Sequence, residues 1–235
     1  MRITLFKCLV IFIYSIGIAH ANNSATKLSF CFEVWQPFAY LNEQGDAAGE
    51  HIAFLQNAAE PYGFQLSFNE MPFKRCLKEV KQGHIDFAMH VDENDGVQLI
   101  DHPMGSWDLL FAYKDKDSRR QIKNKDRKIL VARDYAYPKK VMDKLNSMSV
   151  QVVTESFYTR TPYEVKKLFK LVESGFVDAI LVDKSWAQYE LSKQEINVVL
   201  DDEVLYSQPY YFGYAKGNEE KADFLLQALK ERGKY

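Results

Sequence analysis

Residues 28–89 read LSFCFEVWQPFAYLNEQGDAAGEHIAFLQNAAEPYGFQLSFNEMPFKRCLKEVKQGHIDFAM. Three apolar runs in this stretch, at 28–34, 64–68 and 85–89, have the length and composition of buried strands. A segment with apolar residues at helical spacing follows each of the first two runs. This order predicts a parallel sheet whose ligand-binding loops lie at the carboxyl ends of its strands.

The second half of the chain repeats this order. Short apolar runs at 129–132, 150–153 and 177–182 predict three further strands, and the segments between them favour helices. Residues 83–88 (GHIDFA) and 175–180 (GFVDAI) both place a glycine, an apolar residue and an aspartate at the start of a buried strand. Two similar α/β lobes would leave a cleft between them, which is the default position for a ligand.

The N-terminus has the features of a secretory signal peptide, which we assign to residues 1–21. Arg2 and Lys7 supply positive charge, residues 9–18 form an apolar core, and residues 19–21 (AHA) fit a cleavage site. The apolar core is too short to span a bilayer comfortably. We therefore expect a mature, soluble protein that is exported to the periplasm.

Composition excludes some functional classes. Removal of Arg2 and Lys7 leaves 28 of the 30 basic residues against 32 acidic ones, so the formal charge changes from −2 to about −4. A mildly acidic chain lacks the basic face that nucleic-acid binding requires. The sequence has no glycine-rich phosphate loop and no nucleophile motif, so we expect neither a cofactor nor catalysis. The charged run at 114–128 predicts a solvated connector.

One alternating pattern raises the alternative of a metal site. His84, Asp86, His90 and Asp92 lie at alternate positions interrupted by Ala88, and no further Cys or His cluster accompanies them. We interpret Asp86 instead as the residue that fixes the turn before the strand, as Asp178 does in the second half.

The predicted mature chain contains two cysteines, Cys31 and Cys76. Cys31 lies in the first predicted strand, and Cys76 lies at the start of the helix that connects the second strand to the third. A right-handed crossover carries this helix over the first strand, so the two thiols could meet in an oxidising compartment. A disulfide and a pair of buried free cysteines are both compatible with the sequence.

Several motifs that follow one another along the chain carry a resemblance to a known family. They are PFAY at 37–40 with Gly45 and Gly49 before a helix, MPFKR at 71–75, GHID at 83–86, GFVDA at 175–179 with Asp183 beyond, and the strand-like segment 210–217 before a terminal helix. Their order and spacing, from residue 28 to 235, resemble the periplasmic solute-binding proteins of the amino-acid type (family 3), which deliver small polar solutes to ABC importers.

This resemblance implies an α/β architecture of the type II periplasmic-binding-protein fold, with each lobe a mainly parallel sheet flanked by helices. Lobe 1 would comprise residues 22–111 and 206–235, and lobe 2 would comprise residues 112–205. A small-molecule ligand would bind in the cleft of a monomer. Its partner would be an ABC permease or a membrane sensor.

The resemblance also implies ligand contacts on the loops that border the cleft. The expected ligand-binding residues are Trp35, Phe38, Tyr40, Phe73, Arg75, His90, Asp92, Trp107, Arg133, Tyr135 and Asp183. Members that bind α-amino acids carry an arginine shortly after the third strand, whereas residues 89–103 contain neither Arg nor Lys. Arg75 or Arg133 could replace it, since a guanidinium group binds a carboxylate bidentately.

Three functional hypotheses follow. The first is a non-catalytic binding protein that closes by a hinge near residues 112–114 and 206–207 and supplies an importer. The second is a sensory module that reports its ligand to a signalling partner. The third is a dehydratase-like enzyme on the same scaffold, for which Asp92 and Glu155 are candidate acids. Genes for a permease or for a signalling protein nearby would distinguish the first two.

Overall fold

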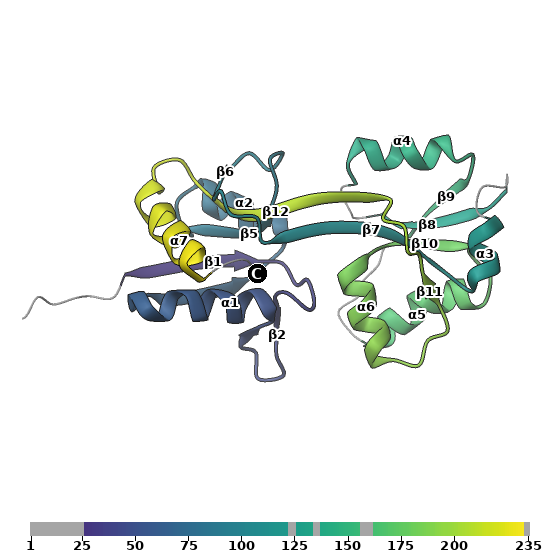
Figure 1. Ribbon diagram of the computed structural model, residues 1–235, viewed down its shortest axis with the longest axis horizontal. Coiled ribbons are helices and arrows are strands. Elements are labelled where there is room, and N and C mark those ends of the chain that lie inside the picture. The colour runs from purple at the N-terminus through teal and green to yellow at the C-terminus, as the bar shows by residue number, and fades with distance from the viewer. Residues whose placement is uncertain (1–25, 122–125, 134–136, 156–161, 233–235) are drawn as a thin grey trace, which may run out of the picture.

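The computed structural model describes residues 26–121, 126–133, 137–155 and 162–232 (Figure 1). The strands are β1 (Lys27–Phe32), β2 (Tyr40–Leu41), β3 (Ala47–Ala48), β4 (Gln65–Glu70), β5 (Phe87–Val91), β6 (Gln98–Leu99), β7 (Gly105–Tyr113), β8 (Lys128–Ala132), β9 (Gln151–Glu155), β10 (Ala179–Asp183), β11 (Val199–Leu200) and β12 (Tyr206–Tyr214). The helices are α1 (Glu50–Ala59), α2 (Phe73–Lys81), α3 (Lys116–Gln121), α4 (Lys139–Ser147), α5 (Pro162–Glu173), α6 (Lys184–Lys193) and α7 (Glu219–Arg232), with a short 3₁₀ turn at Glu60–Tyr62.

The strands form two mainly parallel groups that two long antiparallel strands connect. The order across the sheet is β4-β1-β5-β12-β7-β10-β8-β9. β1 pairs in parallel with β4 and β5, and β8 pairs in parallel with β9 and β10. Figure 1 shows the two groups as separate lobes, with β7 and β12 running side by side from one to the other. The prediction of an α/β fold with mainly parallel sheets is confirmed.

The two connecting strands form a ribbon, which we define as Gly105–Leu109 paired with Tyr206–Tyr210. Beyond this ribbon, β7 pairs with β10 and β12 pairs with β5, so each strand also belongs to the sheet of one lobe. Ala112, where the sequence placed the crossing, pairs with Ile180 in the β7–β10 ladder. Pro209 lies opposite Ser106 in the ribbon and supplies no N–H to the ladder.

The charged run at 114–128, predicted to be a solvated connector, contains helix α3. Helix formation here is compatible with the composition, because Lys, Arg and Gln all have good helix propensity. Residues 114–117 of the run are exposed.

Burial explains why the central strands are apolar on both faces. β1 has the burial pattern of a strand covered on both sides, and its Leu28, Phe30 and Phe32 side chains are fully buried. α1 covers lobe 1 with Ile52 and Leu55, and α7 packs against α1. Lobe 2 has its own apolar clusters around β8 and β10. Each lobe therefore contains a separate hydrophobic core.

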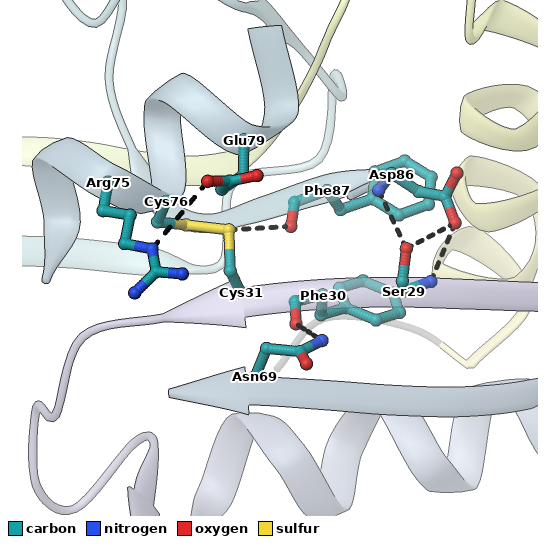
Figure 2. Close-up of a disulfide and its surroundings, with 9 residues drawn as sticks. All are labelled: Ser29, Phe30, Cys31, Asn69, Arg75, Cys76, Glu79, Asp86 and Phe87. Atoms are coloured by element: carbon teal, nitrogen blue, oxygen red, sulfur yellow. Dashed lines mark hydrogen bonds and ion pairs between the residues drawn. A yellow bond between two sulfur atoms is a disulfide. The ribbon is translucent and has the colours of Figure 1, made fainter. Parts of the chain in front are cut away.

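One aspartate in each lobe, Asp86 or Asp178, accepts hydrogen bonds from a neighbouring parallel strand. Asp86 Oδ2 accepts hydrogen bonds from the Ser29 backbone N–H and from Ser29 Oγ, both at 2.8 Å (Figure 2). Asp178 Oδ2 accepts the Lys128 N–H at 2.8 Å, and Arg127 pairs with the same carboxylate. The predicted equivalence of the two aspartates is confirmed. Asp86 binds a residue within β1 and Asp178 binds the first residue of β8, so each carboxylate has a longer-range role than fixing a local turn.

A disulfide joins β1 to α2 in lobe 1 (Figure 2). Cys31 and Cys76 have a Cα–Cα separation of 5.6 Å, and both are fully buried. They pack with Val80, Ala88 and Val91 in a small cluster between the sheet and α2. Of the two arrangements that the sequence left open, the structure has the disulfide.

Candidate functional site

Five aromatic side chains meet at the carboxyl edge of the lobe 1 sheet. We call them the ring cluster: Trp35, Phe38, His51, His90 and Tyr210. The ring centroid of Trp35 lies 4.9 Å from the centroid of His90 and 4.9 Å from that of Tyr210. Phe38 stacks on His51 with a distance of 4.6 Å between their ring centroids. The rings come from the loop after β1, from α1, from β5 and from β12. Residues distant in sequence thus form one aromatic surface.

The two histidines of the ring cluster are hydrogen-bonded to each other. His51 Nδ1 lies 2.9 Å from His90 Nε2. Burial lowers the pKa of His51 to about 3, although a hydrogen bond to the Met104 backbone partly opposes this shift. Burial, together with the nearby His51, holds the pKa of His90 well below its usual range. Both rings are therefore neutral at physiological pH, and one nitrogen donates while the other accepts.

Backbone contacts fix the loop after β1 against the start of α1. The backbone N–H groups of Glu50 and His51 donate to the carbonyls of Pro37 and Phe38, at 3.1 and 3.0 Å. These bonds satisfy N–H groups that the first turn of a helix leaves without intrahelical partners. Gly49 permits the close approach, since its φ is +121° and a Cβ there would lie 2.4 Å from the Phe38 oxygen.

One hydrogen bond joins the ring cluster to lobe 2. Trp35 Nε1 donates to Asp183 Oδ1 at 3.3 Å, and the same oxygen caps α6 by accepting the Trp186 N–H at 2.7 Å. Asp183 Oδ2 is buried and has no hydrogen-bond partner among the described residues. Burial raises the pKa of Asp183 to about 6, and the nearby Asp108 adds to the rise. Hydrogen bonding from the Trp186 backbone, the Trp35 indole and the Ser185 backbone opposes it.

A second contact between the lobes lies beside a pocket. Tyr40 is hydrogen-bonded to Tyr189 of α6, and burial followed by the interaction with Tyr189 raises the pKa of Tyr40. The pocket has a volume of about 360 Å³. Its lining residues are Pro37, Phe38 and Glu50 from lobe 1, and Ser185, Gln188 and Tyr189 from lobe 2. Because both lobes contribute, this pocket is part of a cleft that depends on their relative position.

The structure brings together only some of the residues expected to bind the ligand. Trp35, His90 and Asp183 lie at one place, and Tyr40 lies at the adjoining contact between the lobes. Phe73 instead packs against the apolar cluster around the disulfide.

The expected arginines are both exposed. Arg75, in the first turn of α2, has a side chain 67% exposed and pairs with Glu79 at 3.8 Å (Figure 2). Arg133 follows β8 and donates from Nη2 to the Thr154 carbonyl at 3.1 Å. Neither contact involves the ring cluster.

The remaining expected residues have structural surroundings of their own. Asp92 follows β5 and accepts the Asn94 N–H at 2.6 Å, as a turn-forming aspartate does. Trp107 lies in the ribbon, with its ring centroid 6.4 Å from that of Tyr137 and 6.1 Å from that of Tyr206. Tyr135 lies outside the described residues.

Sequence reasoning missed several residues of this region: Glu50, His51, Gln188, Tyr189 and Tyr210. His51 follows Gly49 at the start of an apolar helix face, which was the one available signal. The described residues contain no group of three or more Cys, His, Asp or Glu side chains that could hold a metal ion. Within them, no helix combines the length and apolar content that a bilayer span requires.

Comparisons with known proteins agree with this architecture. The probable amino-acid ABC transporter extracellular-binding protein ytmK from Bacillus subtilis has a TM-score of 0.74 at 14% identity, with 88% of this chain and 91% of that chain covered. An ancestral arginine-binding protein bound to arginine has a TM-score of 0.65 at 21% identity, with 87% and 91% covered.

A third similar structure also comes from an ancestral amino acid-binding protein. It is the ancestral amino acid-binding protein AncCDT-1, a precursor of cyclohexadienyl dehydratase, with a TM-score of 0.63 at 18% identity and coverage of 87% of this chain and 88% of that one. At such identities the likeness shows the fold alone, and it confirms the type II periplasmic-binding-protein fold. A comparison with curated proteins finds no significant match.

A family model gives the assignment that the structures alone do not. The model described as bacterial extracellular solute-binding proteins, family 3, matches residues 28–234, which is nearly the whole of the chain that the structure describes. The resemblance inferred from the sequence motifs is confirmed. This chain belongs to the bacterial extracellular solute-binding proteins of family 3.

Proposed function

We propose that this protein captures a small polar solute, an amino acid or a related compound, in the cleft between its lobes, and that its closed form supplies an ABC importer from the periplasm. The observation that carries the proposal is the environment of Asp183. One of its carboxylate oxygens bonds to the Trp35 indole of the other lobe, and the second oxygen is buried without a partner among the described residues. A buried polar atom of this kind requires a donor, which a solute N–H would provide.

The proposed capture begins on lobe 1. A solute would first meet the ring cluster, where Trp35 and Phe38 present apolar faces and the neutral His90 adds a polar ring. Lobe 2 would then close through Asp183 and Tyr189. Ligand binding shifts such an equilibrium only through contacts that one conformation makes and the other lacks. The contacts Trp35–Asp183 and Tyr40–Tyr189 have that property, since each joins residues of different lobes.

The ribbon is the proposed hinge. It lies between the lobes, and a few residues in each of two strands can absorb the change of backbone angles that closure requires. We place the lobe boundaries within it, near residues 105–109 and 206–210. The proposal includes no chemical step, so the solute would leave unchanged.

Thermal unfolding of purified residues 22–235 with a solute panel tests this proposal. A solute at one hundred times its Kd stabilises the folded protein by about 2.7 kcal/mol. For a chain of this size that corresponds to a rise in Tm of about 5–10 °C. The panel would contain amino acids, amines, small peptides and organic acids. If every member of such a panel leaves Tm unchanged, the proposal is wrong.

A variant pair ties the response to the cleft. Asp183→Asn removes the charge of the carboxylate but keeps its shape, and we expect it to abolish or strongly reduce the Tm rise for an active solute. Asp143→Asn is the matched control, because Asp143 lies on the exposed surface of α4 in the same lobe and pairs with Lys139. Equal ligand responses of the two variants would show that the solute binds elsewhere.

A further inference from the structure

The contacts Trp35–Asp183 and Tyr40–Tyr189, which join the lobes, differ in their response to pH. Trp35 Nε1 donates to Asp183 Oδ1 at 3.3 Å, and Tyr40 is hydrogen-bonded to Tyr189. Burial, followed by the interaction with Tyr189, raises the pKa of Tyr40 above its ordinary 10, so Tyr40 keeps its proton throughout the acid range. Of these two contacts, the one made by Asp183 is therefore the one that a fall in pH below 7 can change.

The carboxylate of Asp183 uses its two oxygens unequally. Oδ1 accepts both the Trp35 indole N–H and the Trp186 backbone N–H, at 3.3 and 2.7 Å. Oδ2 is buried and has no hydrogen-bond partner among the described residues. A proton on Oδ2 would leave both bonds to Oδ1 in place and would remove a buried charge, which is costly to keep away from water. Protonation thus favours the arrangement in which Trp35 contacts Asp183, which is the closed form.

A second carboxylate, that of Asp108, lies on the hinge side of Asp183. Asp108 belongs to the ribbon, and its Oδ1 accepts the Ser207 hydroxyl at 2.6 Å. Asp183 pairs with Leu109, the next residue of β7, so adjoining strands bring the two aspartates together. The charge of Asp108 disfavours ionisation of Asp183. Tyr206 of β12, opposite Leu109, keeps its proton in the acid range because burial raises its pKa.

The other charged and titratable groups around Asp183 leave this effect in place. Lys184 begins α6, and Arg133 follows β8 and donates to a carbonyl of β9. In lobe 1, the indole of Trp35 is backed by His90, and burial holds the pKa of His90 well below its usual range. In these surroundings burial raises the pKa of Asp183 to about 6. Asp183 therefore gains its proton in mildly acidic solution while His90 stays neutral.

From this arrangement we propose that the contact between Trp35 and Asp183 is an acid-sensitive latch, in which uptake of a proton by Asp183 shifts the lobes toward the closed form. In the open form water hydrates the carboxylate, so its pKa returns toward the ordinary 3.8. The closed form then binds the proton more tightly, and by linkage the proton stabilises the closed form. This contribution is complete below about pH 4 and is lost as the pH rises through about 6. The inference uses the hinge of the proposed function but no property of the solute.

Small-angle X-ray scattering of the solute-free protein tests the inference, because closure lowers the radius of gyration. The ratio of closed to open molecules should rise about tenfold between pH 7 and pH 5, as pKa values of about 6 in the closed form and about 3.8 in the open form require. Asp183→Asn is neutral at every pH and should remove most of this pH dependence. Asp143→Asn, which alters an exposed carboxylate of the same lobe, is the matched control and should respond to pH as the wild-type protein does.

A second variant tests the latch without changing Asp183. Asp108→Asn keeps an oxygen for the Ser207 hydroxyl but removes the charge that opposes ionisation of Asp183. Closure of this variant should therefore have its midpoint at a lower pH than closure of the wild-type protein. A cooperative thermal transition shows that each variant is folded. If Asp183→Asn is unfolded, the shift of the midpoint in Asp108→Asn decides the question.

The outcomes separate this inference from the proposed function. If the radius of gyration of the wild-type protein is the same at pH 5 and pH 7, the latch is wrong. It is also wrong if Asp183→Asn and Asp143→Asn show equal pH dependence, or if Asp108→Asn leaves the midpoint unchanged. In each of these cases a solute that raises Tm at pH 7 would leave the proposed function standing. Acid-driven closure that Asp183→Asn removes would support the latch even if no solute of the panel binds.

Discussion

The disulfide between Cys31 and Cys76 should supply a large part of the stability of lobe 1. The two residues are 45 positions apart in the sequence. In the chain-entropy model, closing a loop of this length in the unfolded state stabilises the folded protein by about 4 kcal/mol. Each kcal/mol corresponds to about 2–4 °C in Tm for a protein of this size. Reduction should therefore lower Tm by about 8–16 °C.

The experiment compares oxidised protein, reduced protein and the double variant Cys31→Ala/Cys76→Ala. Thermal unfolding at pH 7, followed by far-UV circular dichroism, gives the three Tm values. Both cysteines are fully buried, so the double variant also leaves a small cavity beside Val80 and Ala88 and should be no more stable than the reduced protein. Alkylation of denatured, unreduced protein should detect no free thiol.

The double variant also serves as the control for the reductant. A reducing agent should leave the Tm of Cys31→Ala/Cys76→Ala unchanged, because it contains no bond to break. If reduction of the wild-type protein lowers Tm by less than about 2 °C, the loop-closure argument fails for this chain. Modification of both thiols in the unreduced protein would show that the bond itself is absent.

Three further predictions concern single positions. Because burial raises the pKa of Asp183 to about 6, above its ordinary 3.8, the contribution of its protonation to stability is complete below about pH 4 and is lost as the pH rises to about 6. Asp183→Asn should thus reduce the fall in Tm over that range, and parallel Tm profiles for the two proteins would contradict the assignment. Gly49→Ala should destabilise the protein by about 1–3 kcal/mol in urea unfolding, whereas Gly45→Ala should have a smaller effect because a Cβ there meets no atom within 4 Å. Asp86→Asn should lower the free energy of unfolding by about 1.5–3 kcal/mol, since hydrogen bonds from Lys221 and Ser29 hold the pKa of this carboxyl below its usual range despite burial. An unchanged urea midpoint would show that these bonds contribute nothing net to stability.

Much of the fold could be predicted because its signals are local. Several βα units have an apolar run, a helical pattern and a glycine stop within a short stretch, and GHIDFA and GFVDAI marked the equivalent strands of both lobes. β7 was missed, although its residues 109–113 are apolar and buried. Its meaning depends on pairing with β12, about one hundred residues later, and no short-range pattern encodes that partner.

The site was less predictable for the same reason. Trp35 and Asp183 were expected from the family resemblance, which places ligand contacts on the loops that border the cleft. His51 and Tyr210 could not be placed, since their importance depends on contacts with His90 that span 39 and more than one hundred positions. A histidine among apolar helix residues has the same local pattern whether it meets solvent, core or a second histidine.

The ribbon has a consequence for how affinity can change. Where only the closed form holds the solute fully, every measured dissociation constant includes the fraction of molecules that are able to close. A substitution at Ser106 or Pro209, where the ladder lacks one N–H donor, would alter that fraction without approaching the solute. All solutes would then gain or lose affinity by a common factor, and their ranking would be preserved. Sensitivity and selectivity could in this way be adjusted independently, the first in the connecting strands and the second in the lining of the pocket.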